Sequence, residues 1–227
     1  MSFMLTGGGS DPTPPHATPR GMDNGRRIGV VVRNLLYRNE LRGLNRVPAT
    51  GPVLCVANHS AFMDGAVLFG CLPRRVSYLI KAEAVKGPLG WLLTTVGQYA
   101  LQRDVPDREP LLQALAQLKA GGAIGMFPEG TRGAGMVENV FNGAGWLAAR
   151  AGATVVPIAI RGVARPEGRR LPRFRPRVRV LVGEPFAVPP GAGRTAVNAA
   201  TEEIRTRLAA QVAVLDAQLA GRKASRA

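Results

Sequence analysis

Short apolar runs separated by segments of helical length recur along the chain, and this alternation constrains the fold more than any other feature. The runs cover residues 53–57, 76–80, 123–127, 154–160 and 178–182. Between them, residues 110–119 place leucines at the spacing of one helix face. Strands that alternate with helices predict a single α/β domain, in which helices flank a mostly parallel or mixed central sheet.

The chain divides by composition into three parts. Residues 1–25 are rich in Gly, Pro and Thr with little apolar periodicity, which predicts a disordered tail. Residues 26–44 mix apolar side chains with five arginines, as in a basic amphipathic helix at a membrane interface. A helix that packs on the domain with its arginines in water is the alternative. We expect residues 45–221 to form the folded domain.

The charge balance points to an anionic partner. A net charge of +15 suits nucleic acid, an anionic membrane surface or phosphorylated substrates. Aromatic residues make up 5% of the chain and are not interleaved with basic ones, which weakens a single-strand-binding function. Cys55 and Cys71 lie among apolar residues, as free thiols of a reducing compartment do. With neither an apolar run of spanning length nor a signal peptide, we expect a cytoplasmic protein with peripheral membrane contact.

The stretch Asn58–Asp64 follows the first apolar run and carries the strongest chemical signal. On one continuous helix, side chains five positions apart would point about 140° away from each other. His59 and Asp64 therefore meet only if His59 lies in the turn before a helix and Asp64 in its first turns. Asp64 would then accept a hydrogen bond from one ring nitrogen and leave the other as a base. The alternative is a capping or core histidine.

Few chemistries fit this pair. The chain lacks a G-x-S-x-G elbow, and adjacent His59 and Ser60 side chains point apart, so a serine-hydrolase triad is poorly supported. A zinc site lacks ligands, because His16, in the Pro-rich tail, is the only other histidine. The remaining role for His59 is a general base toward a hydroxyl that the substrate brings.

A second polar cluster, residues 127–133, also follows an apolar run, and active sites of α/β proteins form where strands end. Basic side chains recur near the predicted strand ends and turns; they are Lys81, Arg103, Arg132 and Arg161. The planar guanidinium fork suits phosphate, because it can bond two oxygens at once. For each of these residues taken alone, a solvated surface charge is the alternative.

Together these motifs resemble the 1-acylglycerol-3-phosphate acyltransferase group of glycerolipid acyltransferases. Asn58-His59-x4-Asp64 is similar to the first family motif, and Gly97 to Arg103 is similar to the second. The stretch 127–132, Phe-Pro-Glu-Gly-Thr-Arg, matches the third, and 155–158 resembles the fourth. The resemblance covers roughly residues 45 to 185, so 45–221 is identified as an acyltransferase domain.

The resemblance implies a role for each matching residue. His59 is the base and Asp64 orients it. The implied substrate-binding residues are Asn58, Lys81, Gly97, Arg103, Glu129, Gly130, Thr131, Arg132 and Pro157. Within this set, Arg103 and Arg132 hold the acceptor phosphate, and Pro157 lies near the acyl donor.

The implied reaction moves a fatty acyl group from acyl-CoA or acyl carrier protein to the hydroxyl of lysophosphatidic acid. The product is phosphatidic acid, and neither a metal nor a cofactor is expected, because the thioester is already activated. The implied partners are the thioester donor, the lysophospholipid acceptor and an anionic membrane surface, at the cytoplasmic face of the cell membrane. Alternatives are glycerol 3-phosphate or another lysolipid as acceptor, a basic nucleic-acid-binding protein, or a membrane-bound scaffold with a dead site.

Overall fold

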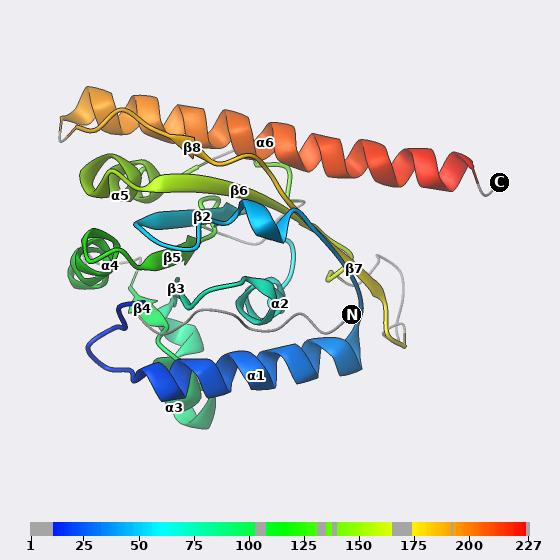
Figure 1. The fold of residues 1–227 in the computed structure, drawn as a ribbon, viewed down its shortest axis with the longest axis horizontal. Helices are drawn as coiled ribbons and strands as arrows, with labels where there is room; N and C mark the ends of the chain where they lie inside the picture. Colours follow the sequence, from blue (N-terminus) through cyan, green and yellow to red (C-terminus); the bar gives the residue numbers. More distant parts are fainter. Residues whose placement is uncertain are drawn as a thin grey trace.

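A mixed β-sheet with helices on both faces runs through the computed structural model (Figure 1). The structure describes residues 11–102, 108–130, 135–137, 140–164, 174–191 and 193–225. The strands are β1 (Arg38–Arg42), β2 (Val53–Ala57), β3 (Val76–Lys81), β4 (Tyr99–Leu101), β5 (Ala123–Met126), β6 (Thr154–Arg161), β7 (Arg177–Val182) and β8 (Phe186–Ala187). The helices are α1 (Pro19–Leu36), α2 (Asp64–Cys71), α3 (Gly87–Thr95), α4 (Glu109–Lys119), α5 (Gly143–Ala151) and α6 (Arg194–Ala224).

The sheet order is β1-β7-β6-β2-β5-β3-β4, with β8 paired to β6. Strand β2 lies between β5 and β6 and is parallel to both, whereas β7 and β8 run antiparallel to β6. The predicted α/β fold is therefore confirmed, and its sheet is mixed.

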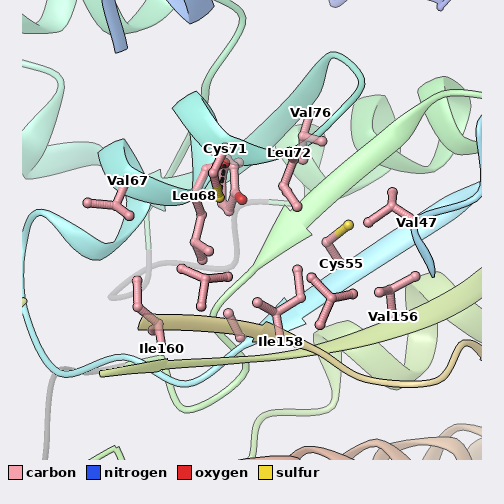
Figure 2. Packing of buried hydrophobic residues seen from close by; sticks show 14 of the residues in the cluster. Val47, Cys55, Val67, Leu68, Cys71, Leu72, Val76, Val156, Ile158 and Ile160 are labelled. Atoms are coloured by element: carbon pink, nitrogen blue, oxygen red, sulfur yellow. Dashed lines mark hydrogen bonds between the residues drawn. The ribbon is translucent and has the colours of Figure 1, made fainter. Parts of the chain in front are cut away.

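Strand β2 forms at the centre because all five of its residues are apolar and buried. Its side chains alternate between two core clusters, as the strand period of two requires. Cys55 faces α2, where Leu68 and the capping residue Leu72 cover one side of the sheet (Figure 2). Leu54 faces the other side, where α4, α5 and α6 pack. Coverage of both faces explains why β2 reads as a continuous apolar run.

The N-terminal part differs from the expected tail and helix. Helix α1 spans Pro19–Leu36 rather than 26–44, because the Thr18 hydroxyl caps it by accepting the N–H of Gly21 at 3.1 Å. A proline at the first helical turn adds to this start signal. Residues 38–42 are strand β1, which pairs with β7.

Residues 11–18 are held against the domain by polar contacts. Asp11 forms a buried ion pair with Arg74, and His16 Nε2 lies 3.0 Å from the carbonyl oxygen of Gln98. The disordered tail expected for 1–25 is therefore wrong for residues 11–25, and residues 1–10 lie outside the described part.

The arginines of the expected amphipathic segment differ in burial and in the element to which they belong. Arg26 is 4% exposed and donates a 2.7 Å hydrogen bond to the carbonyl oxygen of Leu72, so it packs inside. Arg27 is exposed, whereas Arg38 and Arg42 belong to strand β1. Within the described part of the chain, none of the helices combines the length and apolar content needed to cross a bilayer.

Parallel pairing brings the carboxyl ends of β2, β5, β6 and β3 to one edge of the sheet. Val56 of β2 is opposite Met126 of β5 and Pro157 of β6. The residues that follow β2 and β5 are Asn58–Asp64 and 127–130, the described part of the second polar cluster. The fold thus places both motifs side by side, where α/β proteins bind ligands.

Candidate active site

His59 and Asp64 meet as the spacing predicts. His59 lies in the turn after β2, Asp64 is the first residue of α2, and His59 Nδ1 lies 3.1 Å from Asp64 Oδ2. The same oxygen accepts the backbone N–H groups of Ser60 and Ala61, each at 2.7 Å. These bonds stabilise the charge of a carboxylate that is 0% exposed. Because Asp64 accepts at Nδ1, the other ring nitrogen, Nε2, carries the lone pair and can accept a proton.

The second cluster holds the histidine from two directions. The backbone N–H of His59 donates to Glu129 Oε1 at 3.0 Å, and Phe127 stacks on the imidazole at a centroid distance of 4.2 Å. Tyr78 stacks in turn on Phe127 at 5.8 Å. Burial raises the pKa of Glu129, while the N–H groups of His59 and Val137 and nearby cationic charge oppose that rise. The Glu129 carboxylate thus fixes the main chain that carries the base.

A tight turn presents Glu129. The N–H of Gly130 donates to the carbonyl oxygen of Phe127 at 3.0 Å, across Pro128 and Glu129. Gly130 has a φ of 70°, a left-handed conformation that glycine adopts without strain. In the structure Gly130 therefore shapes the turn that aims Glu129 at the histidine loop.

Asn58 is fully buried and ties the histidine loop to β6. Its side-chain amide donates to the carbonyl oxygen of Ile160 at 3.1 Å, and its oxygen accepts the N–H of Ile160 at 2.8 Å. Both functional groups are used within the protein. The structure thus gives Asn58 a positioning role, whereas the resemblance implied that it binds substrate.

Of three other predicted substrate-binding residues, one shares the edge of the pair and two lie elsewhere. Lys81 ends β3 on the same edge and is exposed. Gly97 precedes β4, at the opposite end of the strands; its φ is 83°, and the absence of a Cβ atom lets Met22 of α1 pack closely. Pro157 lies within β6 and packs against Gly183 near α6, on the sheet face away from α2. The structure therefore does not bring Gly97 or Pro157 to His59.

The two cations assigned to the acceptor phosphate, Arg103 and Arg132, lie outside the described residues, as does Thr131. Gln102 directly follows β4 at the edge that carries His59. The phosphate-binding role of both arginines stays a prediction.

Sequence patterns missed several contacts of the site. Phe127 stands in the second cluster, but nothing in the pattern indicates that its ring stacks on His59. The hydrogen bond that the N–H of His59 donates to Glu129 depends on the register of β2 against β5, which the sequence pattern does not give. Asp216 of α6, which binds Arg161 through both carboxylate oxygens at 2.8 and 2.9 Å, has no sequence signal at all.

Comparison with known proteins defines the class. Residues 38–161 match the Acyltransferase family, and the chain belongs to that family. A chloroplast 1-acyl-sn-glycerol-3-phosphate acyltransferase of Arabidopsis thaliana, LPAT1, is 30% identical over 157 residues, which are 66% of this chain and 44% of the relative. The 1-acyl-sn-glycerol-3-phosphate acyltransferase of Bacillus subtilis is 28% identical over 169 residues, or 71% of this chain and 82% of that protein. The chain thus spans less than half the length of its chloroplast relative.

The fold has a counterpart among solved structures. The 1-acyl-sn-glycerophosphate (LPA) acyltransferase PlsC from Thermotoga maritima superposes with a TM-score of 0.68 at 24% identity. The match covers 86% of this chain and 80% of that one. The chain therefore has the glycerolipid acyltransferase fold.

Proposed function

We propose that this chain transfers a fatty acyl group from an acyl thioester to the free hydroxyl of lysophosphatidic acid, giving phosphatidic acid for phospholipid biosynthesis. The observation that carries the proposal is the His59–Asp64 pair, held beside Glu129 at the carboxyl edge of the sheet. Relatives named 1-acyl-sn-glycerol-3-phosphate acyltransferase support the choice of acceptor.

The proposed mechanism uses the imidazole as a general base. His59 Nε2 takes the proton of the acceptor hydroxyl, whose oxygen attacks the thioester carbonyl carbon. Asp64 holds Nδ1–H and stabilises the imidazolium as it forms. The tetrahedral oxyanion then collapses, the new ester forms, the carbon–sulfur bond breaks, and the imidazolium returns its proton to the leaving thiolate. The thioester is already activated, so the proposed reaction requires neither a cofactor nor a metal.

The donor and the exact acceptor belong to the proposal. Acyl-CoA and acyl carrier protein supply the same thioester chemistry, and glycerol 3-phosphate or another lysolipid offers the same hydroxyl. A nucleic-acid-binding protein would need no buried His–Asp pair, and the buried carboxylate of Asp64 therefore favours the enzyme. A scaffold with a dead site would not need to keep the ring and the carboxylate within bonding distance.

An acyl-transfer assay over a panel of acceptors tests the proposal. Purified protein is given acyl-CoA or acyl carrier protein as donor, with lysophosphatidic acid, glycerol 3-phosphate, lysophosphatidylcholine or monoacylglycerol as acceptor. We expect the highest kcat/KM with lysophosphatidic acid. A higher kcat/KM with glycerol 3-phosphate or another lysolipid would overturn the acceptor, and no transfer to any of them would overturn the enzyme.

We also propose that the protein binds the cytoplasmic face of the membrane peripherally, through α1 and α3. The exposed apolar side chains of α1 are Ile28, Val31, Val32, Leu35 and Leu36. At 100° per residue they cover an arc of about 140° on the helix. Exposed Arg20 and Arg27 border this arc, where they can meet anionic headgroups.

Helix α3 extends the apolar surface. It has no charged residue, and Gly90 is its buried residue, while Leu89, Trp91 and Leu92 are exposed. The end of α3 packs on Gly21 and Gly25 of α1, and α3 projects beyond α1 on the side opposite α6 (Figure 1). A tryptophan on such a surface suits the interface of a bilayer. We name the exposed apolar residues of α1 and α3 together the α1–α3 face.

A further inference from the structure

Arg161 bridges the candidate site to the C-terminal helix. It is the last residue of β6, and its Nε and Nη2 atoms donate to the two carboxylate oxygens of Asp216 on α6 at 2.8 and 2.9 Å. Its Nη1 and Nη2 atoms also donate to the carbonyl oxygen of Gly135, each at 3.2 Å. Every guanidinium nitrogen is therefore bound within the protein, so Arg161 is not a free cation for a substrate phosphate.

Gly135 fits closely between Arg161 and the histidine loop. Its φ is 65°, and a Cβ atom there would lie 2.7 Å from Asn58 Nδ2 and 2.8 Å from Arg161 Nη1. Asn58 is the neighbour of His59 and is itself bonded to Ile160, the neighbour of Arg161. Gly135 thus packs against Asn58, which follows β2, and against Arg161, which ends β6.

Val137 connects the segment 135–137 to Glu129 and so to the His59–Asp64 pair. Its N–H lowers the pKa of Glu129, the carboxyl that also accepts the N–H of His59. Its φ of 59° is rare for a β-branched residue, so the surroundings must hold it there. The side chain is 1% exposed and packs against Leu208 and Val212 of α6. Helix α6 therefore fixes the segment 135–137 by apolar contact and, through Arg161, by charge.

We propose that Arg161 is a positioning residue of the acyl-transfer site, and that Asp216 orients it. Asp216 fixes the guanidinium of Arg161, and the guanidinium anchors Gly135. The anchored segment 135–137 presents the N–H of Val137 to Glu129. Glu129 in turn fixes the position of the His59 main chain. This inference rests on the proposed function for its kinetic consequence, but its structural consequence does not depend on it.

The kinetic consequence separates positioning from phosphate binding. A displaced base slows proton transfer for every acceptor, so the loss falls on kcat and is the same with and without a phosphate. We expect Asp216→Asn to lower kcat about tenfold and Arg161→Met about 10²-fold, the scale of a base displaced by about 1 Å. The KM for lysophosphatidic acid should change little, whereas a residue that binds phosphate would raise it.

The structural consequence can be measured by NMR at the backbone N–H of His59. The chain has two histidines, so untagged protein labelled with ¹⁵N-histidine gives two backbone amide signals, from His16 and His59. Glu129→Gln defines the shift that a weakened bond to His59 N–H produces. We expect Asp216→Asn and Arg161→Met to shift the His59 amide in the same direction, and Asp216→Glu to restore it. The His16 amide, near Gln98, serves as internal reference.

Glu202→Gln is the matched control, because Glu202 also lies on α6 and pairs with an arginine, Arg205, but at an exposed position. It should change neither kcat nor the His59 amide. An unmoved His59 amide in Asp216→Asn and Arg161→Met would overturn the inference, as would a loss confined to the KM of phosphorylated acceptors. If wild type transfers no acyl group while the His59 amide moves as expected, the proposed function fails and the positioning network stands.

Discussion

Asp64 binds His59 through the same carboxylate oxygen that accepts the N–H groups of Ser60 and Ala61. One buried atom therefore sets both the tautomer of the imidazole and the turn that carries it. The arrangement couples the start of α2 to the orientation of the ring, because the turn cannot open without releasing the ring. A substitution of the base itself leaves this turn intact, since the backbone donors remain.

We expect His59→Ala to abolish acyl transfer while the protein stays folded. General base catalysis contributes about 10²–10⁴-fold, and the lost positioning of the acceptor adds to that. The imidazole is 17% exposed and its removal costs the stacking on Phe127, but the Asp64 carboxylate still accepts the N–H groups of Ser60 and Ala61 and keeps the turn closed. Turnover is measured with lysophosphatidic acid and acyl-CoA, and thermal unfolding by circular dichroism checks the fold. Near wild-type turnover in a folded variant would show that His59 is not the base.

The central part of the fold was predictable because it follows from side-chain periodicity. The runs at 53–57 and 154–160 are apolar enough to be strands in any surroundings, and the structure has β2 and β6 there. Strand β1 was missed, since Arg38–Arg42 is mostly polar and becomes a strand only by pairing with β7. The start of α1 was missed because the local cap at Thr18 lies within a Pro-rich stretch.

The site was predictable only where its residues are close in sequence. The distance between His59 and Asp64 follows from a turn and the first residue of a helix. The contact between His59 and Glu129 depends on strand register, and that of Arg161 with Asp216 on the docking of α6. The motif position of Gly97 suggests binding, which stays a prediction, whereas the structure shows that its missing Cβ atom allows packing against Met22.

The carboxyl of Glu129 makes stability depend on pH. Burial raises its folded-state pKa above the ordinary value near 4.5, so the folded protein holds this proton more tightly than the unfolded chain does. The stability from that proton is fully present below the ordinary pKa and is lost as pH rises through the raised one. The Glu129→Gln variant has no proton to lose at this position, so its stability does not fall in this way. The free energy of unfolding of the variant minus that of wild type should therefore increase as pH rises above about 4.

Urea unfolding of both proteins at several pH values, at constant ionic strength, measures this difference. Titrating groups that do not interact with Glu129 act equally in both proteins and cancel. His59 and Arg161 are the titratable groups that oppose the raised pKa of Glu129 in the described structure, and both are kept. A difference that is flat or falls with pH would mean that the Glu129 carboxyl is not held at a raised pKa. The same variant should transfer acyl groups more slowly, because a neutral amide accepts the His59 N–H less strongly.

The arginines of the second and third motifs should act on the acceptor phosphate. Each lost charge-assisted bond costs roughly 1.5–3 kcal/mol, so Arg103→Ala and Arg132→Ala should each raise the KM for lysophosphatidic acid about tenfold or more. Transfer to monoacylglycerol, which has no phosphate, should change less. Steady-state kinetics with both acceptors measure the contrast. Equal losses would assign these arginines to the donor or the fold.

The α1–α3 face should decide membrane binding. The triple variant Ile28→Ser, Val31→Ser, Leu35→Ser removes three side chains that are 55–67% exposed, so folding loses little while vesicle binding loses their transfer into lipid. Partial burial of three such side chains contributes roughly 2–4 kcal/mol, which predicts about 10²-fold weaker binding. Arg20→Gln with Arg27→Gln should weaken binding by about 1 kcal/mol per charge at low salt, and less as salt screens it.

Flotation with vesicles of phosphatidylglycerol and phosphatidylcholine measures both effects, and Trp91→Ser tests α3 separately. Val214→Ser is the matched control, because Val214 is 48% exposed on α6, on the opposite side of the sheet. All variants should keep His59-dependent transfer to a soluble short-chain acceptor, since none touches the pair. If the triple variant floats as well as the control, the protein reaches its lipid substrate through another surface, and the apolar side chains of α1 serve a different contact.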